Sequence, residues 1–219
     1  MQNVYTYVME EHGKDGPDIG AGHAGGDGNS RFGVAVAPGE LRIVQDLLNT
    51  ASIRRAGGDV PDLLDAPDTA ARWLDTYGVA GDSPGVGDLR TLRDAIRRSL
   101  VERDHGPDRD DGDRQAAVES VARLRLEADG SVRLVPGSVG IPALGQQVLL
   151  AIYDAQLAGT WRRLKLCRNP LCAVAFWDNS RNTSGVWHDV RTCGNVANLR
   201  KSRARRGRPG PNLPTGRPD

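Results

Sequence analysis

Apolar residues recur at helical spacing in four segments of this chain. Positions i, i+3, i+4 and i+7 fall on one face of an α-helix, so such a stripe is typical of a helix that packs one side on a core. The stripes are Leu41, Val44, Leu47 and Leu48; Ala70, Trp73, Leu74 and Tyr77; Leu89, Leu92, Ile96 and Leu100; and Leu144, Val148, Ala151, Ile152 and Ala155. The pattern predicts four helices, the last from about 139 to 158.

Residues with special backbone or capping properties bound these helices. Pro38-Gly39 precedes the first, and Asn49-Thr50 ends it. Asp65 or Asp68 can cap the second helix, which Gly78 can end, and Gly159 closes the fourth. The third helix carries arginines opposite its apolar stripe, which predicts an ordinary solvated face. These arginines are Arg90, Arg93, Arg97 and Arg98.

A different periodicity appears after an acidic break at residues 104–114. Leu124, Leu126 and Ala128 alternate with charged residues, and Val132 and Leu134 alternate on the return. Asp129-Gly130 between the two runs supplies a tight turn, so the segment predicts a β-hairpin. The fold class expected is therefore mainly α with one small β-hairpin.

Composition divides the chain into four parts. Residues 11–31 are rich in Gly, Asp and His, and a flexible lead is predicted over 1–31. The lead contains G-x-G-x-x-G at Gly20, Gly22 and Gly25, but the strand and helix that a dinucleotide site needs are missing. A helical domain is expected over 32–159, a small C-terminal module over 160–206, and a disordered basic tail over 207–219.

Neither a leader nor a membrane span is expected. The first residues lack a basic start followed by a long apolar run, and the helix around Val148–Ile152 is interrupted by Asp154. All three cysteines lie within 27 residues, which disfavours a secreted disulfide framework. The expected location is the cytoplasm.

The cysteines and one histidine form a compact pattern, C-x4-C followed by H-x4-C after fifteen intervening residues. Zinc prefers four thiolate or imidazole ligands in a tetrahedron, and two short-spaced pairs can supply that geometry. The sequence predicts a structural zinc ion held by Cys167, Cys172, His188 and Cys193. The alternatives are a catalytic zinc with His188 outside the coordination sphere, and three buried free cysteines.

A metal would also make sense energetically. Residues 160–199 are too few for a core of their own, and zinc binding supplies about 10 kcal/mol of folding free energy. Phe176, Trp177 and Trp187 are expected to pack around the metal, and Gly194 to permit a turn whose N–H groups approach the Cys193 sulfur.

This segment resembles the CGNR-type zinc-finger domain of bacterial regulators. The shared residues are Cys167, Asn169, Pro170, Cys172, Phe176, Asp178, Ser180-Arg181-Asn182, Ser184, Trp187 and Cys193-Gly194-Asn195. The helical body, from near Leu41, is similar to the domain that accompanies this finger. The family is regarded as stress-related transcription regulators, so the resemblance implies DNA binding. This chain has His188 where the family usually has cysteine, Val196 in place of the last motif arginine, and Gly185-Val186 where relatives often have basic residues.

The charge distribution favours the same partner. Residues 1–159 carry 16 Lys/Arg against 25 Asp/Glu, whereas residues 160–219 carry 13 against 3. A basic end indicates an anionic partner, most often nucleic acid, although it also serves solubility. A basic helix over 195–206 and an Arg206-Gly207-Arg208-Pro209 segment similar to an AT-hook centre could contact DNA grooves, or the tail could add only general charge. The predicted DNA contacts are Arg181, Arg200, Lys201, Arg203, Arg205, Arg206 and Arg208.

These features together predict a DNA-binding transcriptional regulator with a structural zinc ion. A homodimer through the helical domain is a further expectation. The alternative is a zinc-stabilised module that binds RNA or protein without sequence-specific DNA readout. No histidine pairs with a carboxylate at helical spacing, and no catalytic constellation is visible, so the chain is not expected to be an enzyme.

Overall fold

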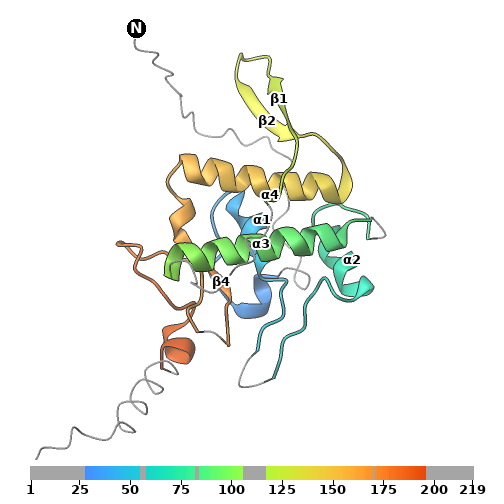
Figure 1. The fold of residues 1–219 in the computed structure, drawn as a ribbon. Coiled ribbons are helices and arrows are strands. Elements are labelled where there is room, and N and C mark those ends of the chain that lie inside the picture. Colours follow the sequence, from blue (N-terminus) through green and yellow to red (C-terminus); the bar gives the residue numbers. More distant parts are fainter. Residues whose placement is uncertain (1–27, 55–57, 82–83, 106–116, 170, 196–219) are drawn as a thin grey trace, which may run out of the picture.

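The computed structural model describes residues 28–54, 58–81, 84–105, 117–169 and 171–195. Its helices are α1 (Leu41–Leu48), α2 (Pro67–Asp75), α3 (Val86–His105) and α4 (Gly140–Leu157) (Figure 1). Its strands form two antiparallel hairpins, β1 (Ala122–Leu126) with β2 (Val132–Pro136), and β3 (Leu164–Leu166) with β4 (Ala175–Trp177). Short 3-10 turns lie at Ser30–Phe32 and Trp161–Arg163, and a π-helical turn at Val190–Gly194.

All four predicted helices are present, and their apolar stripes form one core. Helix α1 packs against both α3 and α4, and the hairpin β3–β4 contacts α1 and α3 at one end of the same core. The largest buried side chain is Trp73 of α2, which is fully buried. The core also takes in Leu164, Leu166 and Ala175 of the C-terminal hairpin. The C-terminal segment therefore shares a core with the helical region.

Two predictions about the helix ends differ in outcome. Gly159 follows α4 with φ +67°, as a terminating glycine should. At α2, however, the residue before the helix is Ala66, which provides no side-chain cap, and Pro67 occupies the first helical position. The expected Asp65 or Asp68 cap is therefore wrong. Proline can replace a cap here because its missing N–H would have had no partner in the first turn.

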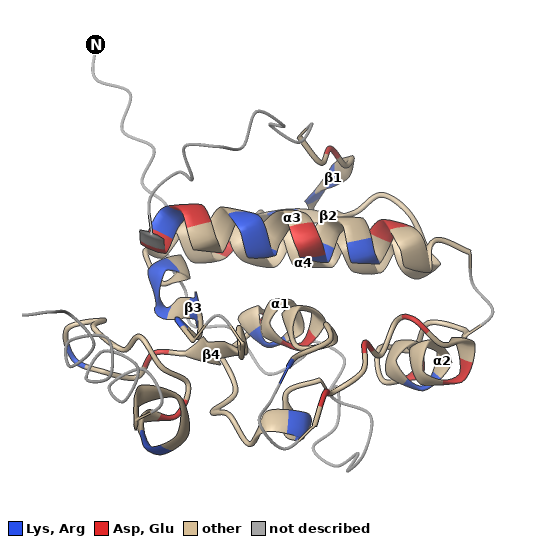
Figure 2. Cartoon of the chain, turned by 60° about the horizontal axis from the view of Figure 1, so that its bottom comes forward, with Lys and Arg blue, Asp and Glu red and all other residues tan. Residues whose placement is uncertain are grey.

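The arginine face of α3 is only in part the solvated face predicted, because Arg90 and Arg98 are exposed but Arg93 and Arg97 are not. Charged residues of both signs alternate along α3 in Figure 2. Arg93 is only 3% exposed, and its guanidinium donates to Asp62 at 2.8 Å and to the Thr50 hydroxyl at 3.1 Å. Arg97 donates to the Leu48 carbonyl at 2.8 Å. Long side chains from the polar face can fold back to satisfy buried carbonyls and carboxylates, which periodicity does not reveal.

The hairpin β1–β2 forms as predicted, in a register that pairs Leu124 with Leu134 and Leu126 with Val132. Gly130 adopts φ +85° in the turn, and the Asp129 carboxylate accepts from the Ser131 N–H at 2.8 Å. The hairpin projects from α4, and its apolar face is exposed, with Leu124 at 74%. The second hairpin, β3–β4, was not predicted because three-residue strands give no readable alternation.

The end of the predicted flexible lead is packed. Asn29 is 1% exposed, and its backbone N–H donates to Asp46 at 2.9 Å. Arg31 donates to the carbonyls of Asn49 and Thr50, each at 3.2 Å. Residues 28–31 therefore belong to the folded part, whereas 1–27 lie outside the described residues. Within the described part of the chain, no helix has the length and apolarity to cross a membrane.

Candidate metal centre

The first two candidate ligands are set by the hairpin β3–β4. Cys167 directly follows β3, and its N–H donates to the Val174 carbonyl at 2.8 Å. The chain then turns back, and the Asn169 carbonyl accepts from the N–H groups of Cys172 at 2.8 Å and Ala173 at 3.1 Å. Ala173 has φ +50°, a left-handed conformation that alanine rarely adopts. This tight turn places both cysteine sulfurs on the same side of the hairpin.

The second pair comes from the long loop after β4 and the π-helical turn. The Asp189 carboxylate accepts from the Arg191 N–H at 2.7 Å and so starts the turn. The Asp189 carbonyl accepts from Cys193 at 3.0 Å and Gly194 at 3.4 Å. A Cβ at Gly194 would lie 3.3 Å from the Trp187 ring, so this glycine permits close packing. The predicted turn is present, but the Gly194 N–H bonds to the Asp189 carbonyl and is not among the N–H groups predicted to approach the Cys193 sulfur.

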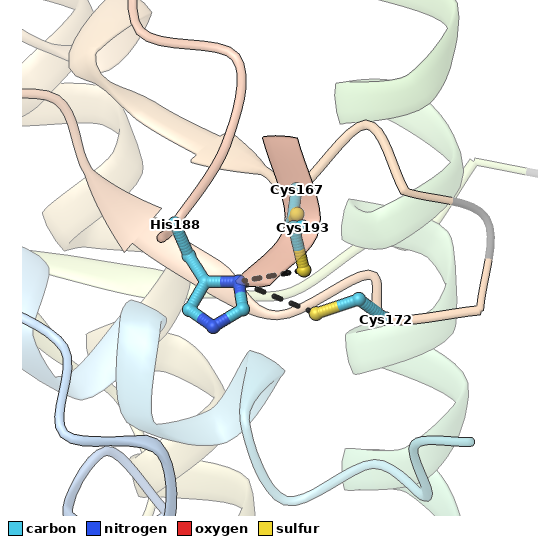
Figure 3. Close-up of side chains that lie close together, drawn as sticks. All are labelled: Cys167, Cys172, His188 and Cys193. Atoms are coloured by element: carbon cyan, nitrogen blue, oxygen red, sulfur yellow. Dashed lines mark hydrogen bonds between the residues drawn. The ribbon is translucent and has the colours of Figure 1, made fainter. Parts of the chain in front are cut away.

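The four predicted ligand atoms converge. The sulfurs of Cys167, Cys172 and Cys193 and one ring nitrogen of His188 all lie within 4.8 Å of one another (Figure 3). The Nδ1 atom of His188 is 3.3 Å from the Cys172 sulfur and 3.7 Å from the Cys193 sulfur. In a tetrahedral zinc site, sulfur and nitrogen ligands are separated by about 3.5 Å. The distances fit such a site, with Nδ1 as the histidine ligand.

The donor set also fits zinc chemically. Three thiols and one imidazole complete four-coordination with protein atoms, as structural zinc sites do. Hydrogen bonds from Cys172 and then His188 lower the pKa of Cys167 to about 4, whereas the bond to Cys167 raises the pKa of Cys172. Zinc would take all three sulfurs as thiolates. Asn169 Nδ2, 3.5 Å from the Cys193 sulfur, is placed to orient that ligand.

The apolar surroundings of the cluster differ from those predicted. Phe32 and Ile53, from the beginning of the described chain, pack with Val174 around the three cysteines, and Trp187 is partly buried against them. Trp177 packs instead against the main core. The predicted packing around the metal is therefore confirmed for Trp187 and wrong for Trp177, which faces the main core; Phe176 is buried but belongs to neither cluster.

A charged residue organises the loop between the ligand pairs. The Asp178 carboxylate accepts from Lys165 Nζ at 2.8 Å, from Ser180 N–H at 2.9 Å and from Gly185 N–H at 2.8 Å. Burial alone would raise the pKa of Asp178, but these hydrogen bonds outweigh it and lower the pKa to about 2. A Cβ at Gly185 would lie 2.7 Å from Asp178 Oδ1. A basic side chain at 185 would thus require the carboxylate to move.

Three residues of the helical body hold the cysteine hairpin in place. The Asn49 side chain donates to the Ala175 carbonyl at 3.0 Å and accepts from the Ala175 N–H at 2.8 Å. Gln45 Nε2 lies 3.4 Å from the same carbonyl, and Arg97 donates to the Ala173 carbonyl at 3.0 Å. Periodicity places Asn49 only at a helix end and does not reveal this role. The local sequence gives no signal for a contact with a residue 126 positions away.

Of the predicted DNA contacts, only Arg181 lies within the residues that the structure describes. Arg181 is exposed in the loop that Asp178 organises. The remaining predicted contacts, Arg200, Lys201, Arg203, Arg205, Arg206 and Arg208, lie outside the described residues, as does the predicted helix over most of 195–206.

Comparison with known protein families gives two matches. Residues 163–206 match the CGNR zinc finger, and residues 41–159, over half of the chain, match the ABATE family, described as "Putative stress-induced transcription regulator". The match to the zinc finger covers all four candidate ligands, so the Cys/His cluster fits zinc binding on both geometry and family. No curated protein matches the chain.

Proposed function

The chain belongs to the ABATE family of transcription regulators and carries a CGNR zinc finger, and we propose on this basis that it regulates transcription by binding DNA. The observation that supports the proposal most is the joint presence of the regulator family match and a zinc finger with four convergent ligands. The family match and the ligand geometry by themselves support a zinc-binding regulator.

The proposed DNA contacts combine the finger with the basic segment after it. Arg181 is exposed on a loop fixed by Asp178, so its guanidinium can reach a phosphate without reorganising the backbone. Arg200, Lys201, Arg203, Arg205, Arg206 and Arg208 follow the last zinc ligand in sequence and would add further phosphate contacts. Such contacts give affinity, whereas sequence choice needs contacts with bases or with DNA shape.

The zinc ion is assigned a structural role. Four protein donors fill a tetrahedron and leave no position for a reacting water, which a catalytic zinc keeps open. The chain therefore acts by binding and not by catalysis in this proposal, and the cytoplasm of a bacterial cell is where such a regulator would meet its DNA.

The experiment compares the intact, zinc-loaded chain with one truncated after Asn198. Genome-wide mapping of bound sites should show discrete peaks for the intact chain and loss of peaks on truncation. In vitro, five or six phosphate contacts predict a log–log dependence of affinity on salt with a slope of roughly −5. A chain that yields no peaks and binds duplex DNA with no salt dependence is not a DNA-binding regulator.

The alternative function is binding of RNA or of an acidic protein by the same basic surface. It is favoured only by charge, since residues 160–219 carry 13 Lys/Arg against 3 Asp/Glu. Competition between duplex DNA, structured RNA and heparin separates the two functions. Equal competition by all three would indicate binding through charge alone.

A second copy of the chain is the proposed partner of the helical region. The apolar face of β1–β2 is exposed, with Leu126 at 72% and Val132 at 58%, and the outer edges of a two-stranded hairpin can pair with another strand. Helix α4 beside it has one charged residue, Asp154, in 18 positions. Sedimentation of the wild type and of Leu126→Glu tests this: the wild type should sediment as a dimer and the variant as a monomer. A monomeric wild type contradicts it.

A further inference from the structure

A groove of about 320 Å³ lies beside the metal centre, on the side of the hairpin β3–β4 that faces the end of α3. Its walls come from the last turn of α3, with Arg103 and Asp104, from Lys165 and Arg168 in and after β3, and from the loop segment 183–186. The groove is therefore built by both family-matched regions of the chain, and three of its side chains are cationic.

Two of these cations hold the walls of the groove. Lys165 Nζ donates to the Asp178 carboxylate and to the carbonyls of Thr183 at 2.6 Å and Gly185 at 3.0 Å, which uses all three of its N–H bonds. Arg103 is bound to Asp104 at 2.7 Å and to the Leu164 carbonyl at 2.8 Å. Each of these cations has its own carboxylate, so the walls are fixed and close to neutral without a ligand.

The remaining polar groups of the groove have unused donors. Arg168 is exposed, and its backbone N–H bonds to the Val186 carbonyl at 2.9 Å. Within the described ranges its guanidinium makes no hydrogen bond or ion pair, and the hydroxyls of Thr183 and Ser184 make none either. Thr183 is held at φ +52°, a conformation that a β-branched residue adopts at a cost. The loop is thus held in one strained geometry that presents two hydroxyls beside one uncompensated cation.

We propose that this groove is a phosphate-binding site, with Arg168 as the charged contact and the hydroxyls of Thr183 and Ser184 as neighbouring donors. A guanidinium and hydroxyl donors suit phosphate, whose oxygens accept from several directions. The phosphate is either a backbone phosphate of DNA, in which case the inference rests on the proposed function, or part of a small phosphorylated molecule. The groove would then anchor the folded finger on its ligand independently of the basic tail.

The test uses the full, zinc-loaded chain with inorganic phosphate and with a duplex of mixed sequence as separate probes. Phosphate should shift the amide resonances of residues 183–186, and Arg168→Ala should abolish the shifts. The matched control is Arg98→Ala, which removes the same charge from an exposed position of α3 outside the groove. For duplex DNA, Arg168→Ala should weaken binding by about tenfold and reduce the magnitude of the salt slope by about one, with little effect of Arg98→Ala.

The outcomes distinguish a failure of the phosphate site from a failure of DNA binding. If phosphate shifts residues 183–186 and Arg168→Ala weakens DNA binding, the site holds a DNA phosphate. If phosphate binds there but Arg168→Ala leaves DNA binding unchanged, or the chain binds no DNA at all, the site takes a small phosphorylated molecule. If phosphate causes no shift at residues 183–186 and Arg168→Ala matches Arg98→Ala on DNA, the site is refuted while DNA binding stands.

Discussion

Asn49 and Ala175, 126 positions apart, exchange two hydrogen bonds through the Asn49 side chain. The amide of Asn49 is fully buried at the end of α1 and pairs with the free edge of β4 as a neighbouring strand would. Because β4 pairs with β3 on its other side, this amide is what completes the bonding of the Ala175 peptide groups. The ligand-bearing hairpin and the helical body are therefore joined by a polar contact inside the core.

We expect Asn49→Ala to destabilise the whole described fold. The Ala175 N–H would be left buried without a partner and its carbonyl with only the longer Gln45 contact, a loss of roughly 2–4 kcal/mol. Urea unfolding of the zinc-loaded protein measures it. Gln147→Ala, which removes an exposed amide from α4, is the matched control and should change the free energy of unfolding by less than about 0.5 kcal/mol. Equal effects of the two substitutions would contradict the role of Asn49.

Loss of the ion pair between Arg93 and Asp62 should destabilise the fold far more than loss of the ion pair between Arg90 and Asp65. The Arg93 and Asp62 side chains are 4% and 6% exposed, whereas those of Arg90 and Asp65 are 44% and 57% exposed. Asp62→Ala would remove the buried partner of Arg93 and leave its guanidinium only the half-exposed Asp94 carboxylate at 2.9 Å and the Thr50 hydroxyl, which should cost roughly 2–4 kcal/mol. Asp65→Ala should cost less than about 1 kcal/mol. Thermal or urea unfolding of the two variants compares the pairs, and similar losses would show that Arg93 is not buried as described.

The low pKa of Asp178, about 2, predicts a pH-dependent contribution to stability. Because the folded pKa lies below the unfolded value of 3.8, the ionised carboxylate stabilises the fold above about pH 4, and this stabilisation is lost as the pH falls from about 4 toward 2. Asp178→Asn should therefore lower the free energy of unfolding by roughly 1–3 kcal/mol at pH 7. The difference from wild type should shrink below pH 4. A difference that stays constant with pH would contradict the assigned interactions.

Removal of zinc should affect the cluster more than the hairpin that carries it. Hydrogen exchange after chelation should show lost protection at the Cys172 and Cys193 amides, whereas the paired residues of β3 and β4, whose strands share the main core, keep part of theirs. Elemental analysis should give one zinc per chain, and Cys193→Ser should weaken its retention.

The zinc content of His188→Cys should be measured beside that of Cys193→Ser. His188→Cys replaces the imidazole by a thiolate, which is an equally competent zinc ligand, so zinc should be retained. Stoichiometric zinc in both His188→Ala and Cys193→Ser would show that the ion is held elsewhere.

The sequence by itself determined the helices, the first hairpin and the four residues that form the candidate zinc site. Helical stripes and the paired ligand spacing are local patterns, and each depends on residues close together in the chain. The four candidate ligands could be predicted from the rule that a tetrahedral zinc ion requires four donors. The structure brings one ligand atom from each of these four residues together. These features could be read without knowing how the segments pack.

Tertiary structure alone decided what surrounds those elements. Arg93 and Arg97 lie on the polar face of α3, yet they point to buried acceptors supplied by residues far away in sequence. Phe32 and Ile53 pack around the cysteines, although well over 100 residues separate them from the nearest ligand. Such contacts depend on which segments meet in space, and a polar residue on a helix looks the same in sequence whether its partner is water or a buried carbonyl.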